Sequence, residues 1–214
     1  MKKSGKKRLE LGKFRVTVFG SSRIQEGDQE YQDIYKLAKM IGNRGIDIIS
    51  GGGPGIMKAA SAGHKAGSKR SGAKTIGLGI RLPHEQRANR YLDIEKKFNR
   101  FSARLDNFMA LSNVIVVAPG GVGTTLELFY AWQLMQVKHV CNIPIILFGD
   151  QWKGIIKWLE KEPLKRGFLD RKDLNLLFLA NNCGEAIKMI EKAYWEYNKG
   201  TKDFCLNFKK YKLY

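Results

Sequence analysis

The sequence predicts a single-domain α/β protein with a doubly wound, mostly parallel sheet flanked by helices. Short apolar runs, each bounded by Gly, Ser, Asn or Asp, alternate with longer amphipathic segments whose apolar residues repeat every three to four positions. The 214 residues are 43% hydrophobic, which is enough for one core of ordinary size. Neither an internal repeat nor a low-complexity segment interrupts this alternation.

The apolar runs predict the strands, and the amphipathic segments predict the helices. We expect strands at 16–19, 46–49, 75–78, 114–117 and 143–148, and a shorter one at 176–179. We expect helices at 29–44, 55–67, 98–112, 124–137, 151–162 and 184–198. These elements would form one domain at residues 14–199, with a basic arm at 1–13 and a basic tail at 200–214.

Positive charge is concentrated at the two ends of the chain. The formal net charge is +18, of which residues 1–15 carry +6 and residues 199–214 carry +4, leaving +8 for the body. A basic body suits a pocket for an anionic ligand. The ends are either solvated arms or segments that contact RNA or anionic lipid, and the sequence leaves both readings open.

Cysteine and histidine positions give little sign of a disulfide framework or a metal site. Cys141, Cys183 and Cys205 show no paired spacing, which indicates a reducing interior. His64, His84 and His139 are scattered, and we expect no metal or redox cofactor. The basic N-terminus lacks an apolar signal core, and no apolar run reaches the roughly 18 residues that span a bilayer. We therefore expect a cytoplasmic protein without a membrane segment.

Three predicted strands end in glycine-rich turns: "FGSSR" at 19–23, "SGGGPGIM" at 50–57 and "APGGVGTT" at 118–125. Because the carboxyl ends of parallel strands share one edge of the sheet, these turns can converge on one crevice. Glycine lets the backbone approach a ligand closely, and the helix that follows presents unpaired N–H groups, so phosphate is the natural ligand. The GxxxxGK[ST] and GxGxxG motifs are both lacking, which favours a mononucleotide or sugar phosphate over a dinucleotide.

Glu127 and Arg104 are the two charged residues that we consider as candidates for chemistry at this predicted crevice. Glu127 lies three residues after Thr124, where it could cap the helix or serve a cationic species such as an oxocarbenium-like sugar. Arg104 lies on the predicted helix 98–112, where it could cover the edge of the core or meet Glu127 across the crevice. The apolar stripe of that helix would consist of Phe98, Phe101, Leu105, Phe108 and Met109.

The segment "PGGVGTTLE" at 119–127 resembles the PGGxGTxxE signature of the Lonely Guy family, cytokinin-activating nucleoside 5′-monophosphate phosphoribohydrolases often labelled "lysine decarboxylase". The resemblance extends to "VFGSS" at 18–22, to "SGGGPGIMKAA" at 50–60, and to an arginine fifteen residues before the signature's proline. "GIRLPHEQRANRY" at 79–91 and "FNRFSAR" at 98–104 are similar to the subgroup that contains bacterial purine and pyrimidine nucleotide nucleosidases.

This resemblance implies a Rossmann-like fold, a homodimer with sites near its interface, and hydrolysis of an AMP-like or cytokinin riboside monophosphate to free base and ribose 5-phosphate. Glu127 would be the catalytic glutamate and Arg104 the catalytic arginine. The phosphate ligands would be Gly120, Gly121, Gly123, Thr124 and Thr125. The other two turns would contribute Ser21, Ser22, Gly51, Gly52, Gly53 and Met57.

The chain also departs from the family pattern. Leu105 stands where members usually carry lysine, and Leu126 and Tyr130 stand where acids are often found. Asn99, Arg100 and Ser102 differ from the subgroup's usual aromatic run, so these departures bear on base preference and turnover. The alternative is a non-catalytic Rossmann-like protein that binds a nucleotide, a cofactor or nucleic acid. Amino-acid decarboxylation is disfavoured, because no residue arrangement indicates a lysine that holds pyridoxal phosphate.

Overall fold

The computed structural model describes residues 10, 12–81, 87–200 and 207. The arm predicted at 1–13 and the tail predicted at 200–214 fall largely outside these residues, as does Cys205.

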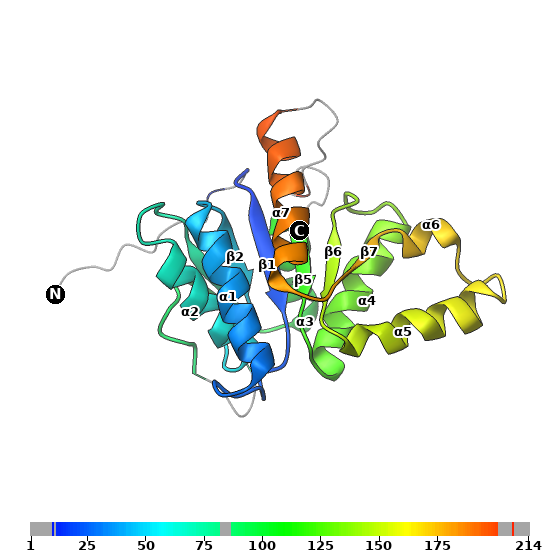
Figure 1. Ribbon diagram of the computed structural model, residues 1–214, viewed down its shortest axis with the longest axis horizontal. Coiled ribbons are helices and arrows are strands. Elements are labelled where there is room, and N and C mark those ends of the chain that lie inside the picture. Colours follow the sequence, from blue (N-terminus) through cyan, green and yellow to red (C-terminus); the bar gives the residue numbers. More distant parts are fainter. Residues whose placement is uncertain (1–9, 11, 82–86, 201–206, 208–214) are drawn as a thin grey trace.

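The strands form one seven-stranded sheet in the order β4-β3-β2-β1-β5-β6-β7, and every neighbouring pair is parallel. Figure 1 shows β2, β1, β5, β6 and β7 following one another across the sheet. The strands are β1 (Arg15–Phe19), β2 (Asp47–Ser50), β3 (Thr75–Ile80), β4 (Ile94–Phe98), β5 (Val114–Val117), β6 (Ile145–Phe148) and β7 (Leu177–Ala180). The winding direction reverses between β1 and β5, which makes the carboxyl ends of these two strands a topological switch point. The predicted doubly wound sheet is confirmed.

Helices cover both faces of the sheet. They are α1 (Gln29–Asn43), α2 (Ile56–Gly67), α3 (Phe101–Leu111), α4 (Val122–Gln136), α5 (Gln151–Leu159), the π-helix η1 (Glu160–Leu164), α6 (Arg171–Leu174) and α7 (Cys183–Asn198). The core on one face contains apolar residues of α1, α2 and α7, and the core on the other contains those of α3, α4 and α5. The central strands are buried on both faces, which explains their nearly continuous β-branched and aliphatic sequences.

Several predicted boundaries are wrong. The strand β4 was not expected, because "IEKKF" has a charged centre and little β-branched content. The helix predicted from residue 98 begins at Phe101, since Phe98 ends β4. The helix predicted from residue 124 begins at Val122, and the one predicted at 151–162 divides into α5 and η1.

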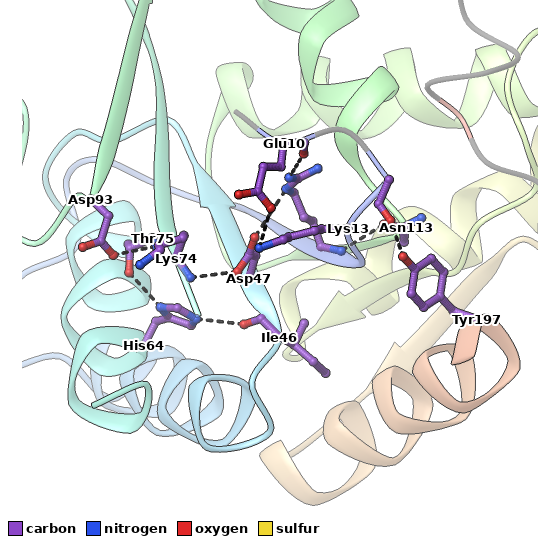
Figure 2. A network of polar contacts seen from close by, with 12 residues as sticks. Glu10, Lys13, Ile46, Asp47, His64, Lys74, Thr75, Asp93, Asn113 and Tyr197 are labelled. Carbon is purple, nitrogen blue, oxygen red and sulfur yellow. Dashed lines mark hydrogen bonds and ion pairs between the residues drawn. The ribbon is translucent and has the colours of Figure 1, made fainter. Parts of the chain in front are cut away.

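A buried polar network joins α2, β2 and β3 at the amino edge of the sheet (Figure 2). His64 on α2 lies 2.9 Å through Nε2 from the Ile46 carbonyl and 2.7 Å through Nδ1 from the Thr75 hydroxyl. Because the carbonyl can only accept, Nε2 carries the proton and Nδ1 accepts from Thr75. Burial lowers the pKa of His64, so the imidazole is neutral in the fold. These hydrogen bonds hold α2 against the amino ends of β2 and β3, at the edge of the sheet opposite the glycine turns.

Cys141 is disulfide-bonded, so the prediction of a reducing interior with unpaired cysteines is wrong for this residue. Cys183 carries a free thiol. Among the residues that the structure describes, no helix is both long and apolar enough to cross a membrane.

Candidate active site

A cavity of about 560 Å³ opens at the carboxyl edge of the sheet, at the switch point between β1 and β5. Its volume lies within the range of roughly 300–1,000 Å³ that is usual for small-molecule sites. The turns after β1, β2 and β5 line it together with residues of β3, β4, α3 and α4. Of the residues predicted for the site, those that line it are Ser21, Ser22, Gly51, Gly52, Gly53, Met57, Arg104, Gly121, Gly123, Thr124 and Glu127.

Backbone hydrogen bonds hold the three glycine turns together. The Ser21 N–H donates to the Pro119 carbonyl at 3.0 Å, and the Ser21 carbonyl accepts from the Ile56 N–H at 2.9 Å. The turn after β1 is therefore bonded both to the turn after β5 and to the first residue of α2. This geometry confirms that the turns converge, as the order of parallel strands required.

The turn after β5 leaves open space in front of α4. Apart from chain neighbours and the helix backbone, no atom of the described residues lies within 4 Å of where a Cβ would stand at Gly121 or Gly123. The first N–H groups of α4 have no acceptor one turn earlier in the helix, so they are available to an anion in this space. Helix and turn together leave an open space with N–H groups directed at it, and phosphate binding in this cradle stays a prediction.

Gly120 and Thr125 were predicted as phosphate ligands but do not line the cavity. The Gly120 N–H donates to Gln151 Oε1 at 2.9 Å, and Gln151 Nε2 donates to the Gly120 carbonyl at 2.6 Å. The Thr125 hydroxyl donates to the Gly121 carbonyl at 3.1 Å. In this structure both residues support the turn from outside, and their contact with phosphate stays a prediction.

The turn after β2 is packed against the functional side chains and depends on glycine. A Cβ at Gly51 would stand 2.5 Å from both Arg104 Nη2 and Met57 Sδ. Gly52 has a φ of +74°, which side chains rarely tolerate. Asn89 holds this turn from outside, because its side-chain amide donates to the Gly52 and Gly53 carbonyls at 3.0 and 3.1 Å. Asn89 is a positioning residue that sequence reasoning missed.

Arg104 and Glu127 meet inside the cavity although they are 23 residues apart. Arg104 Nη1 lies 3.2 Å from Glu127 Oε1, and the two side chains are only 10% and 12% exposed. Arg104 Nε also donates to the Leu78 carbonyl at 2.7 Å, which anchors the guanidinium to the end of β3. The guanidinium carbon lies 5.0 Å from the centre of the Phe108 ring. Arg104 is therefore fixed in place, and the alternative of an arginine on the core's solvent edge is wrong.

Burial sets the protonation of this pair. Desolvation raises the pKa of Glu127 to about 7, against the opposing effect of Arg104, and it lowers the pKa of Arg104. A carboxyl group with this pKa exchanges protons readily at neutral pH, which suits a general acid or base. The capping-box alternative for Glu127 is wrong, because the N-cap of α4 is Gly121 and the carboxylate faces Arg104.

Other residues that line the cavity were not predicted as site residues, although Arg23 belongs to the turn "FGSSR" at 19–23. Phe101 was expected in the packing stripe of α3, but it is 52% exposed and lines the cavity. Arg23, Glu95 and Lys97 line it as well. The only available signal was the position of Glu95 and Lys97 two residues apart, which becomes informative once "IEKKF" is known to be a strand.

The chain matches a protein-family model and several known proteins. Residues 57–190 match the family model described as "Possible lysine decarboxylase". The chain is 32% identical over 150 residues to the pyrimidine/purine nucleotide 5′-monophosphate nucleosidase of Escherichia coli strain K12, a match that covers 64% of this chain and 31% of that protein. The matched part is thus about a third of that relative's length.

For a second relative, the match covers a larger share of the relative's own length. The chain is 25% identical over 188 residues to the "Probable cytokinin riboside 5'-monophosphate phosphoribohydrolase" of Oryza sativa subsp. japonica, covering 83% of this chain and 76% of that protein. The molybdenum cofactor binding protein of Rippkaea orientalis superposes with a TM-score of 0.61 at 21% identity, covering 85% of this chain and 98% of that one, and shows a shared fold. Because the family model spans more than half of the chain and includes Arg104 and Glu127, the chain belongs to the Lonely Guy family, whose model carries the lysine decarboxylase description.

Proposed function

We propose that this protein hydrolyses the N-glycosidic bond of a nucleoside 5′-monophosphate, AMP-like or cytokinin riboside monophosphate included, to free base and ribose 5-phosphate. The observation that carries the proposal is the buried Arg104–Glu127 pair in the same cavity as the open N-terminus of α4. A pure phosphate binder gains nothing from a buried carboxylate beside its anion, whereas a glycosidase needs one. The two relatives described above are named for the same class of reaction, which supports the proposal.

In the proposed mechanism the 5′-phosphate binds at Gly121, Gly123 and Thr124. Glu127 takes a proton from a water molecule whose oxygen attacks C1′, while the bond between C1′ and the base nitrogen breaks and its electrons leave with the base. The departing base takes up a proton from solvent, and Glu127 returns its own proton to solvent, which restores the carboxylate. The Glu127 carboxylate also stabilises positive charge that develops on the ribose.

Arg104 has two parts in this proposal. It fixes the Glu127 carboxylate, and its guanidinium offsets negative charge on the nucleotide or on the departing base. Phosphate contacts supply binding energy far from the reacting bond, which gives a preference for monophosphates over nucleosides. From the family resemblance we also propose a homodimer, and the cytoplasmic location stays a prediction.

A panel assay tests the reaction. The purified protein is incubated with AMP, GMP, IMP, UMP, CMP and isopentenyladenosine monophosphate, and free base is followed by chromatography. We expect base release that disappears in Glu127→Ala. Absence of release from every nucleotide, with AMP still bound, would refute hydrolysis and leave a nucleotide-binding protein.

A non-catalytic role in nucleic-acid binding has one observation in its favour, the net charge of +18. Phosphate-backbone binding weakens steeply with salt because counterions are released, whereas hydrolysis of a bound monophosphate depends little on salt. Removal of residues 1–13 should abolish such binding and leave base release unchanged. An unchanged affinity for single-stranded nucleic acid after this truncation would exclude the arm as the binding element.

A further inference from the structure

The cavity extends beyond the Arg104–Glu127 pair to the edge strand of the sheet. β4 lies four positions from β5 in the strand order, yet its residues Glu95 and Lys97 line the same cavity as the phosphate cradle after β5. Arg104 is bonded to the end of β3, between these two ends. The cavity thus has a cradle at one end, the acid–base pair in the middle, and a charged strand at the other end.

The pleat of β4 directs Glu95 and Lys97 to one face. Ile94 and Phe98 pack in the core with α3, so the alternating side chains of Glu95 and Lys97 point to the opposite face of the strand. Their partners in the parallel register are Gly77 and Gly79. Gly79 lines the cavity, and a Cβ there would lie 3.7 Å from Lys97 Cγ, so the absence of a side chain lets the Lys97 stem lie against β3.

The two charges form one recognition unit. Lys97 Nζ lies 3.8 Å from Glu95 Oε1, and the side chains are 35% and 39% exposed. Edge strands often carry charges that prevent pairing with other sheets, but this role needs no cavity. Phe101, at the start of α3, adds an exposed aromatic ring to the lining of the same cavity. Aromatic rings and polar groups that accept and donate are the usual means of holding a nucleobase.

The proposed reaction decides which part of the nucleotide reaches this end. With the 5′-phosphate at α4 and C1′ beside Glu127, the base extends away from the cradle toward β3 and β4. We infer that Glu95 and Lys97 read the edge of the base and select a guanine-type base over adenine, an inference that rests on the proposed function. The Glu95 carboxylate accepts from N1–H and the 2-amino group, and the Lys97 ammonium donates to the 6-carbonyl oxygen.

All three of these contacts form only with guanine. Hypoxanthine keeps the 6-carbonyl and N1–H but lacks the 2-amino donor. Adenine lacks the carbonyl and offers one amino group. Lys97 has a further effect on the reaction, because negative charge on a departing 6-oxopurine is shared by its oxygen, where the ammonium lies.

GMP, IMP and AMP form a matched substrate set, since they differ only at positions 2 and 6 of the purine. We expect kcat/KM to follow the order GMP, IMP, AMP. Lys97→Met should lower kcat/KM about tenfold for GMP and IMP and less than about threefold for AMP, the size of effect expected for one good base contact. Glu95→Gln should lower the value for GMP about tenfold and reduce the GMP-to-IMP ratio toward one.

Lys96→Met is the control on the opposite face of the same strand, where Lys96 Nζ donates to Asn107 Oδ1. It should leave all three substrate ratios unchanged. Equal losses for the three nucleotides in Lys97→Met and Glu95→Gln, or ratios equal to those of the wild type, would overturn the inference.

Equilibrium binding separates this inference from the proposed function. Calorimetry with GMP, IMP and AMP should show tighter binding of GMP to the wild-type protein, and this preference should be lost in Glu95→Gln. If no nucleotide releases base, hydrolysis is refuted while the binding preference still decides the inference. Equal affinity of the wild-type protein for GMP and AMP would overturn it whatever the turnover.

Discussion

Replacement of Glu127 by glutamine should abolish base release and at the same time stabilise the folded protein at neutral and alkaline pH. Glu127 is 12% exposed, and its pKa is about 7 in the fold against an ordinary value of 4.5. The folded state therefore holds a proton more tightly than the unfolded chain does. Between pH 4.5 and 7 the free energy of unfolding falls as pH rises, and above pH 7 the cost of the buried carboxylate is complete.

The magnitude follows from the two pKa values. Ionising Glu127 in the fold at pH 8 costs about 3 kcal/mol relative to ionising it in the unfolded chain. Glutamine has the same shape, carries no charge, and can accept through its oxygen from Arg104 Nη1. Glu127→Gln should thus raise the free energy of unfolding by about 3 kcal/mol at pH 8 and by less than about 1 kcal/mol at pH 5.

Urea unfolding of both proteins at pH 5 and pH 8 measures this difference. Glu191→Gln is the matched control, because Glu191 pairs with Arg44 on the surface and is 45% exposed, and such pairs contribute roughly 0–1 kcal/mol. A Glu127→Gln protein that is less stable than the wild type at pH 8 would refute the reasoning, since it would mean that attraction to Arg104 outweighs desolvation. So would an equal difference at both pH values.

Two further perturbations test the frame around the site. Gly51→Ala places a Cβ 2.5 Å from Arg104 Nη2 and should displace Arg104, so we expect kcat/KM to fall at least about tenfold. Gly154→Ala is the control: its Cβ meets no described atom within 4 Å, so kcat/KM should not change. Steady-state kinetics with thermal melting checks this, and normal activity of Gly51→Ala would contradict it. His64 is held neutral by burial, so the stability it contributes is complete above pH 6.5 and is lost as pH falls below 6.5. The difference in melting temperature between the wild type and His64→Gln should therefore shrink from pH 7 to pH 5. A difference that stays constant over this range would disprove the role assigned to His64.

The sequence by itself determined the elements whose signal is local. Buried β-branched runs such as 114–117 predict strands because both faces are covered, and glycine-rich turns are recognisable because backbone approach and positive φ require glycine. The rule that the carboxyl ends of parallel strands share one edge then placed the three turns together. The segment at 119–127 indicated the family and Glu127, and the arginine fifteen residues before its proline indicated Arg104.

Only the tertiary structure decided how these residues act. The contact of Arg104 with Glu127, and the burial that brings the pKa of Glu127 to about 7, depend on the packing of α3 and α4 over the ends of β3 and β5. The strand β4 was missed because its charges give no local β signal, and with it were missed Glu95 and Lys97 at the end of the cavity. Periodicity reports which side of an element is apolar, but desolvation and pairing depend on neighbours that are distant in the chain, so they exist only in the folded protein.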